Sequence, residues 1–199
     1  MENRIIKIIE SNENISIKVD ENLSNNFLYL IDAKNDLNFD INLTLTNNSS
    51  IYLNIITFSY NDSKVNINVN TISQDDNIHI VINNHNFGFD NSLINVAIKS
   101  TIINNAKNNQ VYQNILGFLM SESTTIKGQP ILEIQTEQVI AKHSLKIGSL
   151  DKDEVFYLQT KGFSVNLAKK ILIDSLIKKI LYEFPEVTSL INDIIKKRF

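Results

Sequence analysis

The sequence has no cysteine and no tryptophan, and its 199 residues include only five glycines and two prolines. Without cysteine, disulfides and thiolate metal ligands within the chain are excluded. The two signs of charge nearly balance, with 19 basic residues against 22 acidic ones. The formal net charge of -3 gives no reason to expect a polyanionic or polycationic partner, and we expect no nucleic acid.

Motifs for nucleotide binding, nucleophilic catalysis and membrane insertion are missing as well. We find no P-loop, no glycine-rich phosphate cradle and no nucleophile elbow, so we expect no enzyme, and any ATP hydrolysis must come from a partner. No apolar run approaches the roughly 20 residues that a membrane-spanning helix needs. Glu2 and Lys7 near the start do not fit a secretory signal peptide. We therefore expect a cytoplasmic protein with no membrane partner.

The residue pattern changes near residue 150, which predicts a β domain at 1–150 and a helical domain at 151–199. In the first region asparagine recurs every few residues and apolar side chains alternate with polar ones. Alternation with period two places every second side chain on one face of a sheet. The clearest predicted strands are 15–19, 37–45, 65–69, 78–82, 93–98 and 131–134.

Polar clusters at 47–50, 61–63 and 74–77 separate these strands. Asparagine and aspartate tolerate positive φ, so such clusters can form turns where glycine is scarce. A sandwich of hairpins would need Asn-Gly or Asp-Gly turns, which this region lacks. A parallel β-helix with polar corners and coils of about 20 residues fits the spacing slightly better, but the periodicity leaves both architectures open.

The second region predicts helices. Ser164 is a suitable N-cap for a helix over 165–184, and Pro185 then opens another helix. Gly162 is expected to supply a positive φ before the cap. Residues spaced by three and four predict one buried stripe on the long helix: Leu167, Ala168, Ile171, Leu172, Ser175 and Leu176.

A string of motifs crosses the boundary between the two regions. It consists of Asn114–Ser121, Gly128–Ile134, Val139, His143, Gly148, Leu150-Asp151, Phe156-Tyr157-Leu158, Gly162 and Ala168. This string resembles the C-terminal signature of the SufB/SufD family of iron–sulfur cluster assembly proteins, and its spacing is kept without a gap from Leu132 to Gly162. Lys142 and Ser144 differ from the residues that usually flank the histidine of this signature.

The resemblance implies a mainly β protein, with a right-handed parallel β-helix (solenoid) followed by a small C-terminal α-helical domain. It is most like a shortened SufD, because the SufB-type subunit is thought to use a cysteine that this chain lacks. The implied function is that of a scaffold subunit. It would pair through its β-helix with a SufB-like subunit or a second copy of itself, and it would dock a SufC-type ABC ATPase through its C-terminal helices.

The resemblance also implies site residues. His143 matches a histidine that, in SufD-like proteins, lies near the scaffold interface and is implicated in holding iron or the nascent cluster, a role that imidazole suits. No stably bound cofactor is expected; iron or a cluster would be shared transiently with a partner. The residues expected to contact the ATPase are Phe156, Tyr157, Lys161, Gly162, Lys169 and Lys170.

Simpler interpretations stay open for these residues. His143 could do no more than form hydrogen bonds at the edge of a coil, and the lysines of the long helix could be a solvated face. Phe156-Tyr157-Leu158 is most simply core that ties the last strand to the helices. Nearby acidic residues are expected to be solvated or to cap the next segment: Asp151, Asp153 and Glu154. We expect His79 and His85 to be surface or corner residues.

Two other function classes compete with the scaffold. A carbohydrate-active β-helix would show carboxylates clustered along one strand face and aromatic sugar platforms, but the strand region offers scattered acids. An adhesive β-solenoid would be exported and would lack the motifs between His143 and Gly162. The sequence does not distinguish a homodimer from a heterodimer.

Overall fold

The computed structural model describes residues 2–197 and divides the chain into two compact units, Met1–Gly148 and Ser149–Phe199. The first unit contains the strands β1 (Glu2–Ile9), β2 (Glu13–Val19), β3 (Ser24–Ala33), β4 (Leu37–Leu45), β5 (Ser50–Ser59), β6 (Lys64–Ser73), β7 (His79–Gly88), β8 (Leu93–Ile102), β9 (Asn109–Leu119), β10 (Thr125–Ile134) and β11 (Val139–Gly148). The second contains the helices α1 (Lys152–Thr160), α2 (Val165–Glu183) and α3 (Thr188–Lys196), with a 3₁₀ turn at Pro185–Val187.

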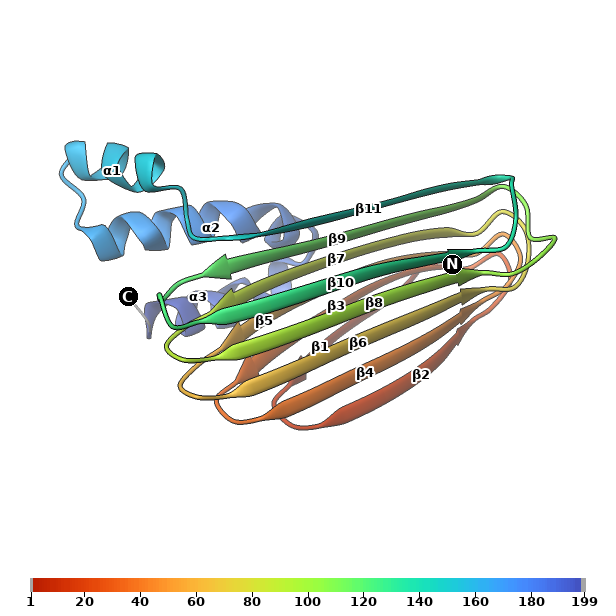
Figure 1. Cartoon of the computed structure of the whole chain (residues 1–199), viewed down its shortest axis with the longest axis horizontal. Helices are drawn as coiled ribbons and strands as arrows, with labels where there is room; N and C mark the ends of the chain where they lie inside the picture. Colours follow the sequence, from red (N-terminus) through yellow and green to blue (C-terminus); the bar gives the residue numbers. More distant parts are fainter. Residues whose placement is uncertain (1, 198–199) are drawn as a thin grey trace. The chain divides into compact units, whose positions relative to one another are not determined.

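The strands form two sheets in which every paired neighbour is parallel. One sheet has the order β1-β3-β5-β7-β9-β11, and the other has the order β10-β8-β6-β4-β2. The chain alternates between the two sheets, so each coil contributes one strand to each of them (Figure 1). The parallel β-solenoid is therefore confirmed, and the alternative of a hairpin sandwich is excluded because hairpins would produce antiparallel pairs.

The core lies between the two sheets and is built from alternate residues of each strand. In β4, for example, Leu37, Phe39 and Ile41 are buried, whereas Asn38 between them is exposed. Each inward side chain stacks on the inward side chain of the next coil, as Ile41 does on Val69. Full burial of such a side chain stabilises the fold by roughly 1.5–3 kcal/mol.

The alternation rule missed β3 and β5 because apolar residues occupy both faces of these strands. In β3, Phe27 and Tyr29 belong to the core, and the outward Leu28 and Leu30 are buried as well. An uninterrupted apolar run of this kind has no period to detect, and periodicity cannot separate it from a buried helical segment.

Asparagines in the left-handed region turn the chain at successive corners. Asn22, Asn48, Asn77 and Asn108 have φ values of 60°, 54°, 56° and 57°. Their side-chain amides form a ladder along the solenoid, in which each Nδ2 donates to the Oδ1 of the coil before it, over 3.2, 2.9 and 3.4 Å. The predicted turns at 47–50, 61–63 and 74–77 are confirmed, and asparagine does there what glycine does elsewhere.

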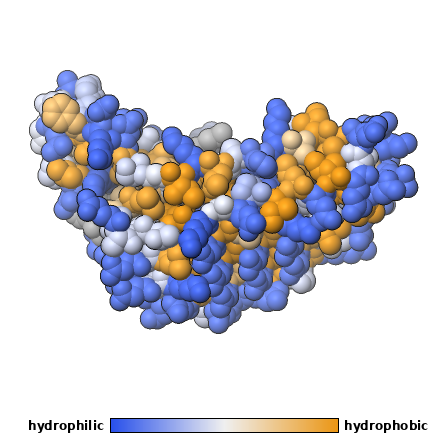
Figure 2. Space-filling view, in the orientation of Figure 1, coloured by the Kyte–Doolittle hydropathy of each residue, from blue (hydrophilic) through white to orange (hydrophobic). Residues whose placement is uncertain are grey.

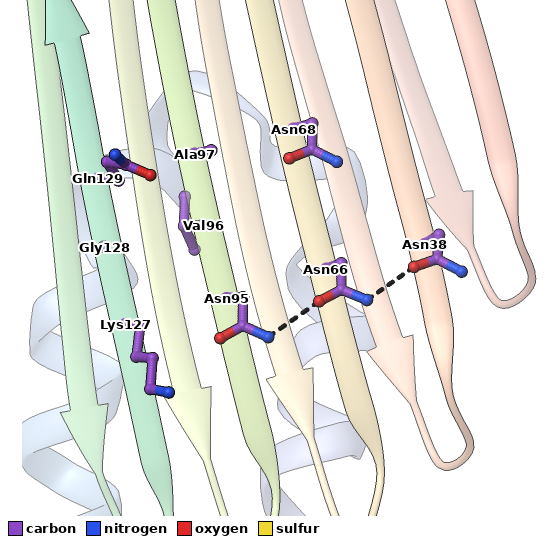
Figure 3. A pocket seen from close by; sticks show the side chains of 9 residues that line it. All are labelled: Asn38, Asn66, Asn68, Asn95, Val96, Ala97, Lys127, Gly128 and Gln129. Atoms are coloured by element: carbon purple, nitrogen blue, oxygen red, sulfur yellow. Dashed lines mark hydrogen bonds between the residues drawn. The ribbon is translucent and has the colours of Figure 1, made fainter.

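A second set of amide ladders runs across the outer faces of the sheets. Asn95 Nδ2 donates to Asn66 Oδ1 over 2.9 Å, and Asn66 Nδ2 donates to Asn38 Oδ1 over 2.7 Å (Figure 3). Stacked amides satisfy one another when identical positions of successive parallel strands are in register. This explains why asparagine recurs through the first region and becomes rare after it.

The helical unit begins and turns at predicted caps. Asp151 caps α1 by accepting a hydrogen bond from the Asp153 amide over 2.8 Å. Gly162 has a φ of 91°, as predicted, and the Ser164 hydroxyl accepts from the Leu167 amide over 3.3 Å at the start of α2. No helix within residues 2–197 has the length and apolar character needed to cross a membrane.

One prediction for the helical unit is wrong in part and another is wrong. The buried positions of α2 include Ala168, Ile173 and Ile177, whereas Leu167 and Leu176 of the predicted stripe are 42% and 38% exposed. The helix is apolar around much of its circumference, so three- and four-residue spacing did not single out the buried face. The segment Phe156-Tyr157-Leu158 is not core either, because α1 has no buried residue.

The corner ladder gives a prediction about stability. Asn77→Ala should lower the free energy of unfolding by roughly 1–2 kcal/mol, because alanine is disfavoured at positive φ. Asn77→Gly keeps the backbone freedom and loses only the amide bonds, so it should cost about 1 kcal/mol less than alanine does. Urea unfolding of the two variants measures the difference, and an alanine variant as stable as the glycine variant would contradict the role of backbone conformation.

Candidate functional site

The last coil of the solenoid, formed by β10 and β11, leaves one end of the core open. Among the described residues β10 pairs only with β8 and β11 only with β9, so the far edge of each strand has no β partner. Large apolar side chains are partly exposed there, with Ile134 at 40%, Ile140 at 48% and Leu145 at 45%. Figure 2 shows apolar residues more frequent toward this end and hydrophilic residues covering the face of β2, β4 and β6. An open edge with apolar side chains is a surface suited to strand pairing.

His143 lies in the middle of β11 and faces the interior of this last coil. Its Cα neighbour across the sheet is Gln113 of β9, which alternates with the core residues Val111 and Ile115. His143 therefore occupies an inward position, yet it is exposed because no further coil covers it. The structure thus places the predicted histidine at the mouth of the solenoid.

The two residues on either side of His143 have side chains on the opposite face of β11. Lys142 and Ser144 stand next to Tyr112 and Asn114 on the outer face. The Ser144 hydroxyl donates to Asn114 Oδ1 over 2.8 Å, and this extends an amide ladder that runs from Asn54 through Asn83 to Asn114. Both departures from the family signature thus concern the outer face, and neither alters the interior position of His143.

One polar row crosses the mostly apolar interior next to His143. Gln113 is fully buried, and its Nε2 donates to the Ser100 hydroxyl over 2.8 Å and to the Ile131 carbonyl over 3.1 Å. The hydroxyls of Thr71 and Ser100 lie 2.8 Å apart. A hydrogen-bonded row of side chains thus crosses three coils and ends beside the histidine. Sequence reasoning missed Gln113, because its neighbours in space come from strands far apart in the chain.

The histidine is a single-ligand candidate on this chain. Within residues 2–197 no group of three or more His, Asp or Glu side chains is placed to hold a metal ion. One imidazole can complete a coordination shell whose other ligands come from elsewhere, and its second ring nitrogen must then be held by a hydrogen bond.

The opposite end of the solenoid also exposes apolar side chains, with Ile5 at 39% and Ile8 at 46%, but it carries an ion pair among its inward positions. Lys7 of β1 and Glu13 of β2 occupy inward positions next to Tyr29 and Phe39 and form an ion pair. Burial, and secondarily the negative charge of Glu13, raises the pKa of Tyr29 to about 12. Inward-pointing charges are a device by which proteins protect the exposed edges of sheets from pairing.

The other two histidines lie on β7, away from the open end, and neither is simply a surface residue. His79 is half-buried between Tyr52 and Tyr112, and its Nδ1 lies 3.3 Å from the Tyr52 hydroxyl. Burial lowers the pKa of His79 and lowers that of His85 to about 4. The prediction that His85 is a surface or corner residue is wrong, because its side chain is partly buried beside Ile56 and its Nδ1 is buried.

Residues predicted to bind the ATPase cluster on α1. Phe156 and Tyr157 are 66% and 59% exposed, and the Lys161 ammonium lies 5.2 Å from the centre of the Tyr157 ring. Gly162 forms the turn that follows α1. Lys169 and Lys170 lie in the first half of α2 and are partly buried, so they are not the fully solvated face of the simpler interpretation. The exposed aromatic pair with its cation is the feature of this set that resembles a binding surface.

A groove on the outer face of the five-stranded sheet bears on the carbohydrate alternative. Its volume is about 560 Å³, and it is lined by Asn38, Asn66, Asn68, Asn95, Val96, Ala97, Lys127, Gly128 and Gln129 (Figure 3). The lining includes neither a carboxylate nor an aromatic ring. A glycosidase needs a carboxylate pair, so this groove does not favour a carbohydrate-active function.

Comparison with known proteins links the chain to one family. A family profile described as "SUF system FeS cluster assembly, SufBD core domain" matches residues 11–176. An iron–sulfur cluster assembly SufBD family protein of Synechocystis is 34% identical over 67 residues, and the chloroplastic protein ABCI7 of Arabidopsis thaliana is 30% identical over 67 residues. Each match covers 34% of this chain, and 15% and 14% of these two relatives.

Burial of His85 predicts a dependence of stability on pH. The pKa of His85 is about 4 in the folded chain and about 6.5 in an unfolded one. The contribution of His85 to the free energy of unfolding is therefore fully present above pH 6.5. It falls by roughly 2–3 kcal/mol as the pH is lowered toward 4. His85→Leu should lose less stability between pH 7 and pH 4.5 than the parent chain does, as measured by urea unfolding. Equal losses in the two chains would contradict the burial of a neutral imidazole.

Proposed function

Because the chain belongs to the SufBD family of the SUF system for iron–sulfur cluster assembly, we propose that it is a non-catalytic scaffold subunit whose open end forms part of the assembly site. The observation that carries the proposal is the inward-facing yet exposed position of His143 in the last coil. Iron and the growing cluster are the cargo of such a scaffold, so they would be held transiently. The ATP that drives assembly would be hydrolysed by a partner.

Pairing takes place at the β10–β11 end in this proposal. The edge strand β11 can add a strand from a partner, and the partly exposed Ile134, Ile140 and Leu145 would be covered in the complex. The ion pair of Lys7 and Glu13 makes the other end a poor surface for the same contact, because pairing there would bury two charges. The partner is a SufB-like subunit or a second copy of this chain.

His143 would supply one ligand to iron or to the nascent cluster at this interface. A chain without cysteine offers no thiolate, so the remaining ligands would come from the paired subunit and from the cargo's own sulfide. Imidazole ligation in place of thiolate is established chemistry for iron–sulfur centres. The proposed pairing would therefore also complete the proposed iron site, because His143 lies at the end of the solenoid where the partner would bind.

The ATPase of the SUF system would dock on the helical unit through Phe156, Tyr157 and Lys161, with Gly162 shaping the adjoining turn and Lys169 and Lys170 adding charge. Exposed aromatic and cationic side chains dominate the energetics of many interfaces. α1 has no buried residue, so its exposed face is available without disturbing a core. A cytoplasmic location stays a prediction, and the Arabidopsis relative is named as a chloroplast protein.

The docking proposal predicts which aromatic residues matter. The double variant Phe156→Ala/Tyr157→Ala should bind a SufC-type ATPase at least tenfold more weakly, since loss of two interface aromatics costs about 2–4 kcal/mol. Tyr182→Ala is the control, because Tyr182 on α2 is 88% exposed and lies outside the predicted set. Affinity is measured with the purified ATPase by calorimetry. If all three chains bind equally, docking does not use this surface.

A pair of variants in β11 separates pairing from ligand supply. Leu145→Asp places a charge in the open end and should abolish pairing with a SufB-like subunit or a second copy. His143→Ala should pair normally but lower the rate of cluster formation by the complex by at least tenfold. Pairing is measured by light scattering and cluster formation by visible absorbance. A His143→Ala complex that assembles clusters at the parental rate would remove the histidine from the function.

A further inference from the structure

The side chain next to His143 in the interior of the solenoid is Gln113. Register places Gln113 beside Ile82 of β7 on one side and beside His143 of β11 on the other. Parallel strands lie about 4.8 Å apart, so inward side chains at these positions are in contact range. Ile82 has no polar atom, and the inward neighbours along β9 are Val111 and Ile115. His143 is therefore the polar neighbour of Gln113 at these adjacent positions.

The hydrogen bonds of Gln113 fix which way its amide points. Nε2 donates to the Ile131 carbonyl over 3.1 Å and to the Ser100 hydroxyl over 2.8 Å. A backbone carbonyl can only accept, so the atom beside it must be the nitrogen and not the oxygen. Both Nε2 hydrogens are used, and the orientation is set by the network without reference to the histidine.

The amide oxygen of Gln113 lacks a donor. Gln113 is fully buried, and within residues 2–197 its Oε1 has no hydrogen-bond partner. A buried carbonyl oxygen without a donor costs about 1–3 kcal/mol, so native proteins supply one wherever a donor is in reach. Oxygen can only accept here, and the ring N–H of His143, which does not bond to it in this structure, is the side-chain donor at the adjacent position.

We propose that Gln113 is a positioning residue for His143: its Oε1 accepts the N–H of one ring nitrogen and leaves the other nitrogen bare at the mouth of the solenoid. The inference rests on the proposed function, since a ligand to iron must present an unprotonated nitrogen. A hydrogen bond at the second nitrogen fixes both the tautomer and the ring orientation. Gln113 touches neither iron nor cluster.

The tautomer of His143 tests this directly in the full chain without metal or partner. Ring ¹⁵N NMR at about pH 8, where histidines are neutral, should show one tautomer for His143, with well-separated shifts for its two ring nitrogens. Gln113→Leu removes the acceptor, so the two shifts should move toward each other as both tautomers become populated. The signals are assigned by their loss in His143→Ala.

Ser100→Ala is the matched control. It loosens the same network and leaves Gln113 Oε1 in place, so the tautomer of His143 should stay single. A parental chain in which His143 already populates both tautomers overturns the proposal, even if the leucine variant does not fold. So does a Gln113→Leu chain with unchanged ring shifts, which would mean that water and not His143 satisfies Oε1.

Cluster formation gives a second readout that separates this inference from the proposed function. Gln113→Leu should slow cluster formation by the paired complex by about tenfold, the lower end of what loss of a residue that orients a ligand costs. If Gln113 controls the tautomer while His143→Ala leaves assembly unaffected, the positioning contact stands and the role of the histidine in assembly fails.

Discussion

Every structural feature of the first unit depends on the parallel register of successive strands. Because strands two apart in the chain are in register, identical positions stack from coil to coil, so Ile41 meets Val69 and Asn38 meets Asn66. The same register that stacks apolar side chains inside also aligns amides on the outer faces and at the corners. It brings Gln113 beside His143, although thirty positions of the chain separate them. A shift of the strand register by one residue would move each inward side chain to the outer face and each outer side chain to the interior.

Much of this fold could be predicted from residue types alone. Strict alternation marked β2, β4, β6 and β8, and the scarcity of glycine pointed to asparagine at the corners. The cap at Ser164 located α2, whereas α1 was not predicted as a helix. What alternation could not show was the pairing partner of each strand, since period two is common to hairpins and solenoids. The resemblance to a known family decided between them, and the parallel pairing confirmed it.

The candidate site was predictable only in part, for a related reason. His143 was found because motif residues around it keep their spacing. The residues around it were not found: Gln113 is its neighbour across the sheet and bonds to Ser100 of another coil, and the ion pair of Lys7 and Glu13 joins two strands at the opposite end. The reverse error occurred at Phe156 and Tyr157, where apolar character suggested core but α1 offers no layer to bury them. Apolarity alone does not distinguish a core residue from an interface residue.

The edge position of β11 has a consequence for local folding. In a solenoid each coil is stabilised mainly by its immediate neighbours, so stability is distributed along one dimension and opening begins at the ends. Among the described residues the coil that carries His143 has a neighbour on one side only, so its amides would be among the first to exchange with solvent. A partner bound there would act as the missing coil. In the proposed complex, partner binding and the ordering of His143 would then be thermodynamically coupled. In the unpaired chain the coil that carries His143 would be less ordered than in the complex.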